Sequence, residues 1–219
     1  VVDGLYQSYN DILSSPNAAA LGAYRPGDFK FKDISGPDGK GPDGKITSDD
    51  RTKIGDPSPK FTYGGSATLN YKGLSLGIDI AGVYGNSIFR TWGSLESPFQ
   101  RVNYSAEKMG RWNGPGTSNW VPILSQADRF NYTGSTYNIE DGSYVRIRNI
   151  QLAYSFSNSL LSRVSVKNLR VFLNFQNPKT WKHNLGYTPE YGGDATSFGY
   201  DTGGGAIPAV STVGLNVTF

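Results

Sequence analysis

Hydrophobic and polar residues alternate one by one at the end of the sequence. The apolar set is Val213, Leu215, Val217 and Phe219, and the set between them is Thr212, Gly214, Asn216 and Thr218. A period of two places the two sets on opposite faces of a β-strand. In a soluble sandwich the apolar face would meet a second sheet, whereas in a membrane barrel it would meet lipid while the polar face looks into a wet interior. The alternation alone leaves both architectures open.

The same alternation predicts four further strands. They are 61–71 and 74–80, which form a hairpin around Lys72-Gly73, and the segments 150–156 and 169–176. Upstream of Ile150, Val145 and Ile147 fall on the opposite parity, which predicts a bulge near Arg148 and Asn149. Pro178 is expected to end the last of these strands, because proline cannot donate to the ladder.

Strand length and loop length favour the membrane architecture. The predicted strands have about 10 to 12 residues, against about 5–6 in globular sheets, which is about the length that a tilted strand needs to cross a bilayer. Two connections, at 72–73 and 157–168, are short, and those at 5–58, 86–142 and 178–205 are long. Short turns on one side and long loops on the other are typical of outer-membrane barrels.

We therefore predict an all-β fold, an antiparallel transmembrane β-barrel. Residues 1–58 are expected to be an extracellular loop region and 59–219 the carboxy-terminal transmembrane strands. Five strands cannot close a membrane barrel, which needs at least about eight, so we expect the chain to be part of a longer polypeptide.

Composition agrees with a β-rich and turn-rich protein. The 219 residues include 28 Gly, 14 Tyr and 11 Phe, only 37% are hydrophobic, and there is no cysteine. No apolar run is long enough for a transmembrane helix, and no leader resembling a signal peptide opens the sequence. The net charge of +3 is spread out, which argues against nucleic-acid binding. His183 is the only histidine, so the sequence offers no histidine metal cluster or catalytic triad, and we predict that the protein is not an enzyme.

Several short blocks, in order along the chain, resemble the carboxy-terminal region of SusC/RagA-type TonB-dependent transporters. They are Pro26–Asp33, Asp50-Arg51 with Ile54-Gly55, Pro59–Gly64, Gly82–Asn86, Glu140–Ile150, Asn168–Phe172 with Gln176-Asn177, and Gly186–Glu190. The resemblance implies a 22-stranded barrel in the bacterial outer membrane, of which this chain supplies roughly the last five strands. It also implies partners: the remainder of the barrel, an amino-terminal plug, the TonB complex, and a lid lipoprotein of the SusD type. Neither plug nor TonB-contacting sequence is among these residues, and the sequence departs from the family in its acidic loop and at Pro178-Lys179.

The acidic loop from Asp33 to Asp50 is a candidate calcium site. Its second half resembles an EF-hand-like loop, in which Asp43, Asp50 and the carbonyl of Lys45 would supply oxygen ligands around a glycine turn. In the family the first acid lies closer, whereas here Asp33 precedes Asp43 by ten residues because a Gly-Pro-Asp-Gly-Lys unit is repeated. The sequence leaves two readings open, bound calcium and a solvated Asp/Gly/Pro turn cluster.

Three other groups of residues are candidates for function. Aromatic residues in the expected outer loops could contact substrate or lid, or else pack within the loops: Trp92, Trp112, Trp120, Trp181 and Tyr187. Arg170, Asn174 and Gln176 are expected to line the barrel lumen, where they could face the transport path or bond to the plug. Val213, Leu215, Val217 and Phe219 resemble the terminal strand that serves as an outer-membrane assembly signal.

Two functions are compatible with these observations. The first is TonB-dependent import of glycans or peptides across the outer membrane. The second is a non-transporting SusC-like barrel that acts as a scaffold in an outer-membrane complex. A soluble carbohydrate-binding sandwich fits worst, because strand length and loop asymmetry oppose it.

Overall fold

The computed structural model describes residues 1–16, 24–92, 104–124, 134–157, 161–162, 165–192 and 197–219. The chain forms two compact units. The first, which we call the loop unit, comprises Val1–Asp56, Phe89–Ile139 and Tyr200–Gly203. The second, the strand unit, comprises Pro57–Ile88, Glu140–Gly199 and Gly204–Phe219. The predicted region 59–219 included 86–142 as a long loop between strands, and the described residues between Phe89 and Ile139 cluster with the amino-terminal segment.

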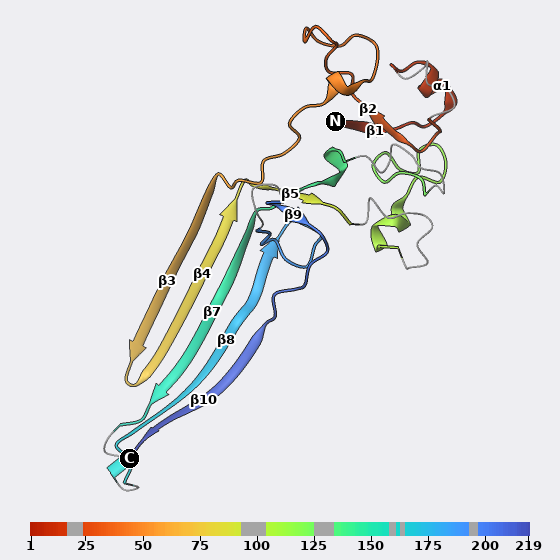
Figure 1. The fold of residues 1–219 in the computed structure, drawn as a ribbon. Helices are drawn as coiled ribbons and strands as arrows, with labels where there is room; N and C mark the ends of the chain where they lie inside the picture. Colours follow the sequence, from red (N-terminus) through yellow and green to blue (C-terminus); the bar gives the residue numbers. More distant parts are fainter. Residues whose placement is uncertain (17–23, 93–103, 125–133, 158–160, 163–164, 193–196) are drawn as a thin grey trace. The chain divides into compact units, whose positions relative to one another are not determined.

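The strand unit is a single antiparallel sheet of five strands (Figure 1). In chain order they are β3 (Phe61–Tyr71), β4 (Leu74–Tyr84), β7 (Tyr144–Ser155), β8 (Asn168–Lys182) and β10 (Val210–Thr218). The spatial order is β10-β8-β7-β4-β3, so β3 and β10 are the edges and the described strands do not close into a barrel. All five predicted strands are confirmed.

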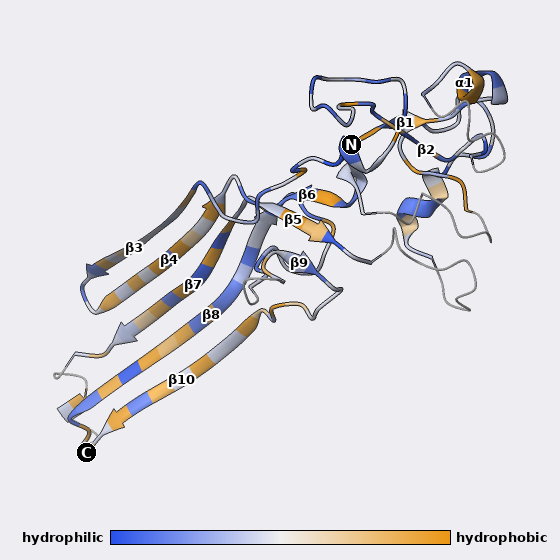
Figure 2. Ribbon diagram, turned by 45° about the horizontal axis from the view of Figure 1, so that its top comes forward, coloured by the Kyte–Doolittle hydropathy of each residue, from blue (hydrophilic) through white to orange (hydrophobic). Residues whose placement is uncertain are grey.

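Register places the apolar residues of neighbouring strands directly opposite one another. One transverse row runs through Leu69, Leu76, Leu152, Leu173 and Val213. The next row on the other face runs through Thr68, Gly77, Gln151, Asn174 and Thr212. Hydropathy accordingly changes from residue to residue along the strands (Figure 2). The sheet therefore has one apolar face and one largely polar face, which also carries Val83, Ala153 and Phe172.

The bulge predicted in β7 is present. Ile147 pairs with Ile80 and Asn149 with Asp79, so that Arg148 has no partner in β4. The register between β7 and β8 shifts at the same point. The extra residue returns Val145 and Ile147 to the apolar face, which explains why their parity differs from that of the residues after the bulge.

Strand β8 passes through Pro178, which corrects the prediction that this proline ends the strand. Ile147 pairs with Lys179 and Asn149 with Gln176, so Asn177 and Pro178 lie in the irregular stretch between these pairs. No regular ladder bond is required from a proline at such a position. The strand then continues to Lys182, and residues 178–182 belong to the sheet and not to a loop.

The hairpin between β3 and β4 turns at Lys72 and Gly73, which have φ angles of 44° and 86°. Positive φ at both positions is the requirement of a type I′ turn, whose twist matches that of the strands. A Cβ atom at residue 73 would lie 2.5 Å from the carbonyl oxygen of Ser155, so only glycine fits there.

The loop unit is built on short elements that frame two small apolar clusters. Strands β1 (Val2–Leu5) and β2 (Phe29–Phe31) pair antiparallel, and helix α1 (Tyr9–Leu13) follows β1. Val2, Leu5, Phe29 and Tyr137 form one cluster, and Tyr6, Ile12 and Tyr24 form the other. The remaining elements are η2 (Ser48–Asp50), β5 (Ser87–Arg90), η3 (Ala106–Gly110), η5 (Thr136–Asn138), β6 (Ile139–Asp141) and β9 (Tyr200–Asp201). None of the helices among the described residues has the length and apolar character needed to span a membrane.

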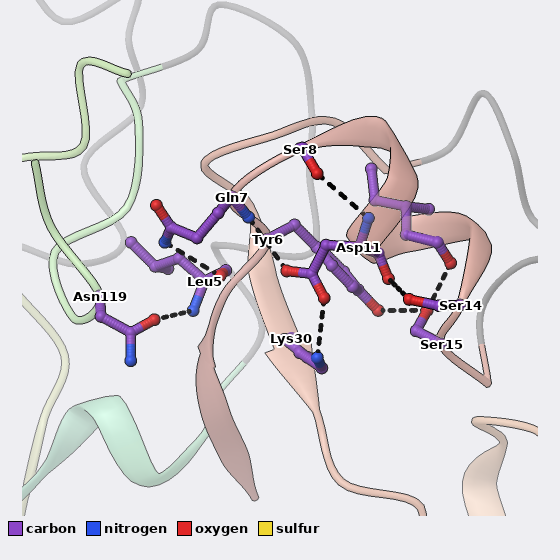
Figure 3. Close-up of polar contacts among 10 residues, drawn as sticks. Leu5, Tyr6, Gln7, Ser8, Asp11, Ser14, Ser15, Lys30 and Asn119 are labelled. Carbon is purple, nitrogen blue, oxygen red and sulfur yellow. Dashed lines mark hydrogen bonds and ion pairs between the residues drawn. The ribbon is translucent and has the colours of Figure 1, made fainter. Parts of the chain in front are cut away.

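Polar contacts hold α1 against β2 (Figure 3). The hydroxyl of Ser8 caps the helix by accepting a hydrogen bond from the amide of Asp11, at 3.2 Å. The Asp11 carboxylate accepts from the amide of Gln7 at 3.1 Å and from the Lys30 ammonium at 2.9 Å. A segment predicted to be an irregular loop thus has its own apolar core and its own hydrogen bonds and ion pair.

Candidate functional site: the two faces of the sheet and the loop unit

The apolar face has the layout expected of a surface that meets lipid. Its middle carries aliphatic side chains, with Leu69 and Val213 70% and 73% exposed. Aromatic residues lie on the same face toward both ends of the strands: Phe61, Tyr63, Tyr84 and Trp181 at one end, and Tyr71, Tyr154 and Phe156 at the other. Paired aromatic girdles around an aliphatic band are characteristic of outer-membrane barrels.

The predicted lumen residues Arg170, Asn174 and Gln176 all lie on the polar face. Arg170 donates from its guanidinium to the Gln151 side-chain oxygen at 3.1 Å. Asn174 lies opposite Gln151, and Gln176 lies opposite Asn149. The three side chains belong to one strand and face the same side, but whether they meet cargo or plug remains a prediction.

A polar cluster that the sequence did not reveal lies on the same face, near the start of β7. Glu190 accepts hydrogen bonds from the Tyr144 hydroxyl at 2.6 Å and from Arg148 at 3.3 Å, and its other oxygen lies 3.0 Å from Arg146. The Arg146 guanidinium also donates to Thr180 in β8 at 2.8 Å. This cluster fixes the segment around Glu190 to the polar face of the sheet.

In the loop unit, buried Arg90 is the centre of a second ionic cluster. Its guanidinium donates to both oxygens of Glu107, at 2.7 and 3.3 Å, and lies over the rings of Trp92 and Tyr137. The Tyr137 hydroxyl also donates to Glu107, at 2.9 Å. Burial alone would raise the pKa of Glu107, but Arg90 and Tyr137 outweigh it and hold the pKa below its usual value. Burial, together with the Glu107 charge, raises the pKa of Tyr137.

The aromatic candidates occupy different environments. Trp112 packs against the cluster around Phe29 and donates to Gln7 at 3.1 Å, and Trp92 lies 5.2 Å from the Arg90 guanidinium. Trp120 is half exposed, with its ring 5.4 Å from that of Tyr137.

The remaining two aromatic candidates belong to the strand unit. Trp181 was expected in an outer loop, but it lies in β8 on the apolar face, opposite Val145. Tyr187 follows β8 and is largely exposed. The five aromatic candidates are thus divided between the two units, and their contact with substrate or lid stays a prediction.

The assembly-signal candidates lie at the edge of the sheet. Val213, Leu215 and Val217 lie opposite Leu173, Val171 and Leu169 on the apolar face, and Phe219 follows the end of β10. This placement is the one that a membrane-facing terminal strand requires. Recognition by insertion machinery is a separate property and stays a prediction.

The acidic loop is closed by its own backbone amides. Both oxygens of Asp33 accept hydrogen bonds, from the amides of Asp43 at 3.2 Å and Gly44 at 2.7 Å. Buried Asp50 accepts from the amides of Ile34, Ser35 and Thr47, at 2.6, 3.2 and 2.7 Å.

These contacts are those of an Asp/Gly/Pro turn cluster, and calcium binding by this loop stays a prediction. The described residues contain no group of three or more acidic, histidine or cysteine side chains already placed to hold a metal ion. Burial alone would raise the pKa of Asp50, but the amide bonds outweigh it and lower the pKa.

Comparison with known proteins identifies relatives among outer-membrane receptors. No protein-family model matches the sequence. TonB-dependent receptor P3 of Formosa agariphila is 30% identical over 99% of this chain, and TonB-dependent receptor P26 of the same organism is 30% identical over 80%. The chain spans about a fifth of these relatives, 21% and 18% of their lengths. Their names denote receptors, a class distinct from enzymes, in agreement with the prediction that the protein is not an enzyme.

Solved structures show the same fold. The RagAB peptide importer in its open-open state matches 88% of this chain with a TM-score of 0.69 and 23% identity, and the match covers 21% of that chain. The closed-closed state gives a TM-score of 0.67 over 87% of this chain, at 22% identity and 21% of that chain. The fold, the two-faced sheet and the receptor relatives agree: the chain belongs to the TonB-dependent receptors and forms part of an outer-membrane barrel.

Proposed function

We propose that the full-length protein imports oligosaccharides or peptides across the outer membrane and that TonB drives this import. The observation that carries the proposal is the polar face of the sheet, where Arg170, Asn174, Gln176 and Gln151 share the side opposite the lipid-facing residues and Arg170 donates to Gln151. Such a wall serves passage of a polar oligomer. A barrel with an apolar interior would not present such polar side chains to a cargo.

The proposal includes a plug inside the barrel and a SusD-like lipoprotein that covers it. The loop unit offers exposed apolar side chains for such a lid, among them Tyr9, Met109 and Trp120. A lid that covered these side chains would remove their apolar surface from water.

Import and scaffolding differ in whether the protein uses TonB. We would replace the full-length gene in its host by a variant without the TonB-contacting segment, and follow the depletion of a defined mixture of oligosaccharides and peptides by mass spectrometry. We expect the wild type to deplete one of the two classes. The variant should deplete neither, at equal abundance in the outer membrane.

Two outcomes of this assay identify the class of cargo and distinguish import from scaffolding. The class that is depleted tells whether glycans or peptides are the cargo. Equal depletion of both classes by wild type, variant and a deletion strain would contradict import and favour the non-transporting scaffold.

A further inference from the structure

The bulge in β7 turns an additional arginine toward the polar face. Arg148 is the residue without a partner in β4, and its guanidinium reaches the same Glu190 oxygen as the Tyr144 hydroxyl. Arg146, two residues earlier, reaches the other Glu190 oxygen and bonds to Thr180. Strict alternation with Ile150 would have aimed residue 148 at lipid, whereas the bulge places two arginines side by side on the polar face.

Arg146 and Arg148 differ in how many of their N–H donors are bonded to the protein. Arg146 is 4% exposed and holds both Glu190 and Thr180 at normal hydrogen-bond distances. Arg148 makes one contact, at 3.3 Å, to an oxygen that already accepts a 2.6 Å bond from Tyr144, and its side chain is 56% exposed. A guanidinium has five N–H donors in a planar fork, so most donors of Arg148 face solvent.

The charge of the cluster is not balanced. One carboxylate, Glu190, lies between two guanidinium groups, which leaves one positive charge. The rest of the polar face does not compensate for it. Within the five strands of the sheet this face carries the cations Arg146, Arg148, Arg170 and Lys182 and the acid Asp79, while Glu140 and Asp141 lie in β6 just before β7. An excess of one sign along a wall raises the local concentration of ligands of the opposite sign.

We propose that Arg148 is a specificity-determining residue that binds a carboxylate group of the transported oligomer. This inference rests on the proposed import function and assigns it a charge preference. Arg146 and Tyr144 hold Glu190, and Glu190 in turn positions the Arg148 guanidinium. The free edge of that fork presents paired donors, the geometry that a carboxylate accepts in bidentate form.

A purely structural role would have a different signature. If Arg148 served only to fix the segment around Glu190, its loss would affect neutral and anionic cargo alike. If it binds cargo, its loss affects only the anionic member of a matched pair, and the effect shrinks as salt screens the charge.

The test uses two matched pairs of probes with the full-length receptor in outer membranes. One pair is an aspartate-containing hexapeptide and its asparagine counterpart, and the other is an oligogalacturonate and its methyl ester. Within each pair the skeleton is constant and only the charge differs. The receptor variants are Arg148→Gln and, as the control, Lys179→Gln, which removes a cation at the same level of the sheet from the apolar face.

We expect Arg148→Gln to weaken binding of the acidic member of one pair about fivefold, the size of one exposed charge-assisted contact, with less effect in high salt. Binding of the neutral member should not change, and Lys179→Gln should behave as wild type. The pair that responds identifies the source of the anionic group. Equal weakening of both members of a pair, or no weakening of either acidic probe, overturns the role of Arg148. The depletion assay described above tests import without reference to charge, so a failure of import is seen separately.

Discussion

At the scale of single residues, the loop unit depends on a few buried ions. Arg90 is only 2% exposed, and Glu107 provides the carboxylate that it contacts. A buried arginine deprived of its carboxylate costs about 3–5 kcal/mol, because the remaining charge stays desolvated. The same pair makes the stability of the loop unit depend on pH.

The direction of this dependence follows from the lowered pKa of Glu107. An acid whose pKa is lower in the folded state stabilises the fold above its unfolded pKa, about 4.3 for glutamate, and this stabilisation is lost as the pH falls through the folded value. We expect the protease resistance of residues 104–124 in the full-length receptor to be constant above about pH 5 and to fall below about pH 4.

Glu107→Gln supplies the control for this prediction. It should lower the free energy of unfolding of the loop unit at neutral pH, measured through its protease resistance, by about 3 kcal/mol. It should also make this free energy less dependent on pH below about pH 5. Asp11 and buried Asp50 also have lowered pKa values in the folded loop unit, so acid destabilises it through them as well and the variant keeps part of the slope. A variant with wild-type resistance at neutral pH and at pH 4 would contradict the role assigned to this ion pair.

A second prediction at this scale concerns the acidic loop. Because Asp33 and Asp50 are committed to backbone amides, we expect neither added calcium nor a chelator to change the protease resistance of the loop unit. Asp50→Ala, in contrast, should destabilise it by about 2 kcal/mol whether or not calcium is present, since buried amides lose their acceptor. A saturable calcium effect that Asp50→Ala abolishes would favour the calcium reading instead.

Sequence spacing identified the acidic loop but not its bonding. The positions of Asp33, Asp43 and Asp50 are visible in the sequence, whereas the amides that they accept from depend on how the loop folds. Glu190 belongs to one of the family blocks, but the sequence gives it no role, because its partner Tyr144 lies 46 residues away in β7. Contacts of this kind leave no periodic signal in one sequence.

At the scale of elements, alternation was sufficient to predict the sheet. It identified five strands, the hairpin turn and the bulge at Arg148, because each of these changes or preserves the two-residue period. It failed at Pro178, where the rule that proline ends a strand was applied without knowing that the register is irregular there. A rule that rests on one residue type is least reliable where that residue coincides with a shift in strand register.

The two faces of one strand provide a matched test of the membrane assignment. Leu152 and Gln151 are neighbours in β7 that point to opposite sides, Leu152 in the aliphatic band and Gln151 beside Arg170. A lysine at the lipid-facing position should cost about 2–4 kcal/mol near the middle of the bilayer, whereas lumen positions tolerate charge. We expect Leu152→Lys to reduce the amount of heat-modifiable folded receptor and Gln151→Lys to leave it nearly unchanged. Equal loss in both variants would mean that the face with Leu152 does not meet lipid.

At the scale of the whole molecule, the long loops are not independent of one another. The sequence suggested separate outer loops, but Tyr137 from one of them completes the cluster around Val2, Leu5 and Phe29 from another. Such packing brings together residues more than a hundred positions apart, and no pattern in the sequence announces it. Deleting residues 92–138 would therefore remove a core residue of the loop unit, and it is too severe a test of lid binding.

A surface substitution tests lid binding without damaging that core. Met109 lies in η3, one residue before its end, with 85% of its surface exposed, so a charge at this position disturbs no packed neighbour within the described residues. If a lipoprotein lid covers the loop unit, a buried glutamate at the interface would lack a partner, and we expect Met109→Glu to weaken co-purification of the lid roughly tenfold or more. Asn113→Glu adds the same charge at a polar exposed position nearby in sequence and should have little effect.

Barrel assembly, followed by heat modifiability, should be normal in both variants. Undiminished co-purification with Met109→Glu would place the lid contact on another part of the loop unit, and loss of the folded barrel would show that Met109 supports the receptor itself.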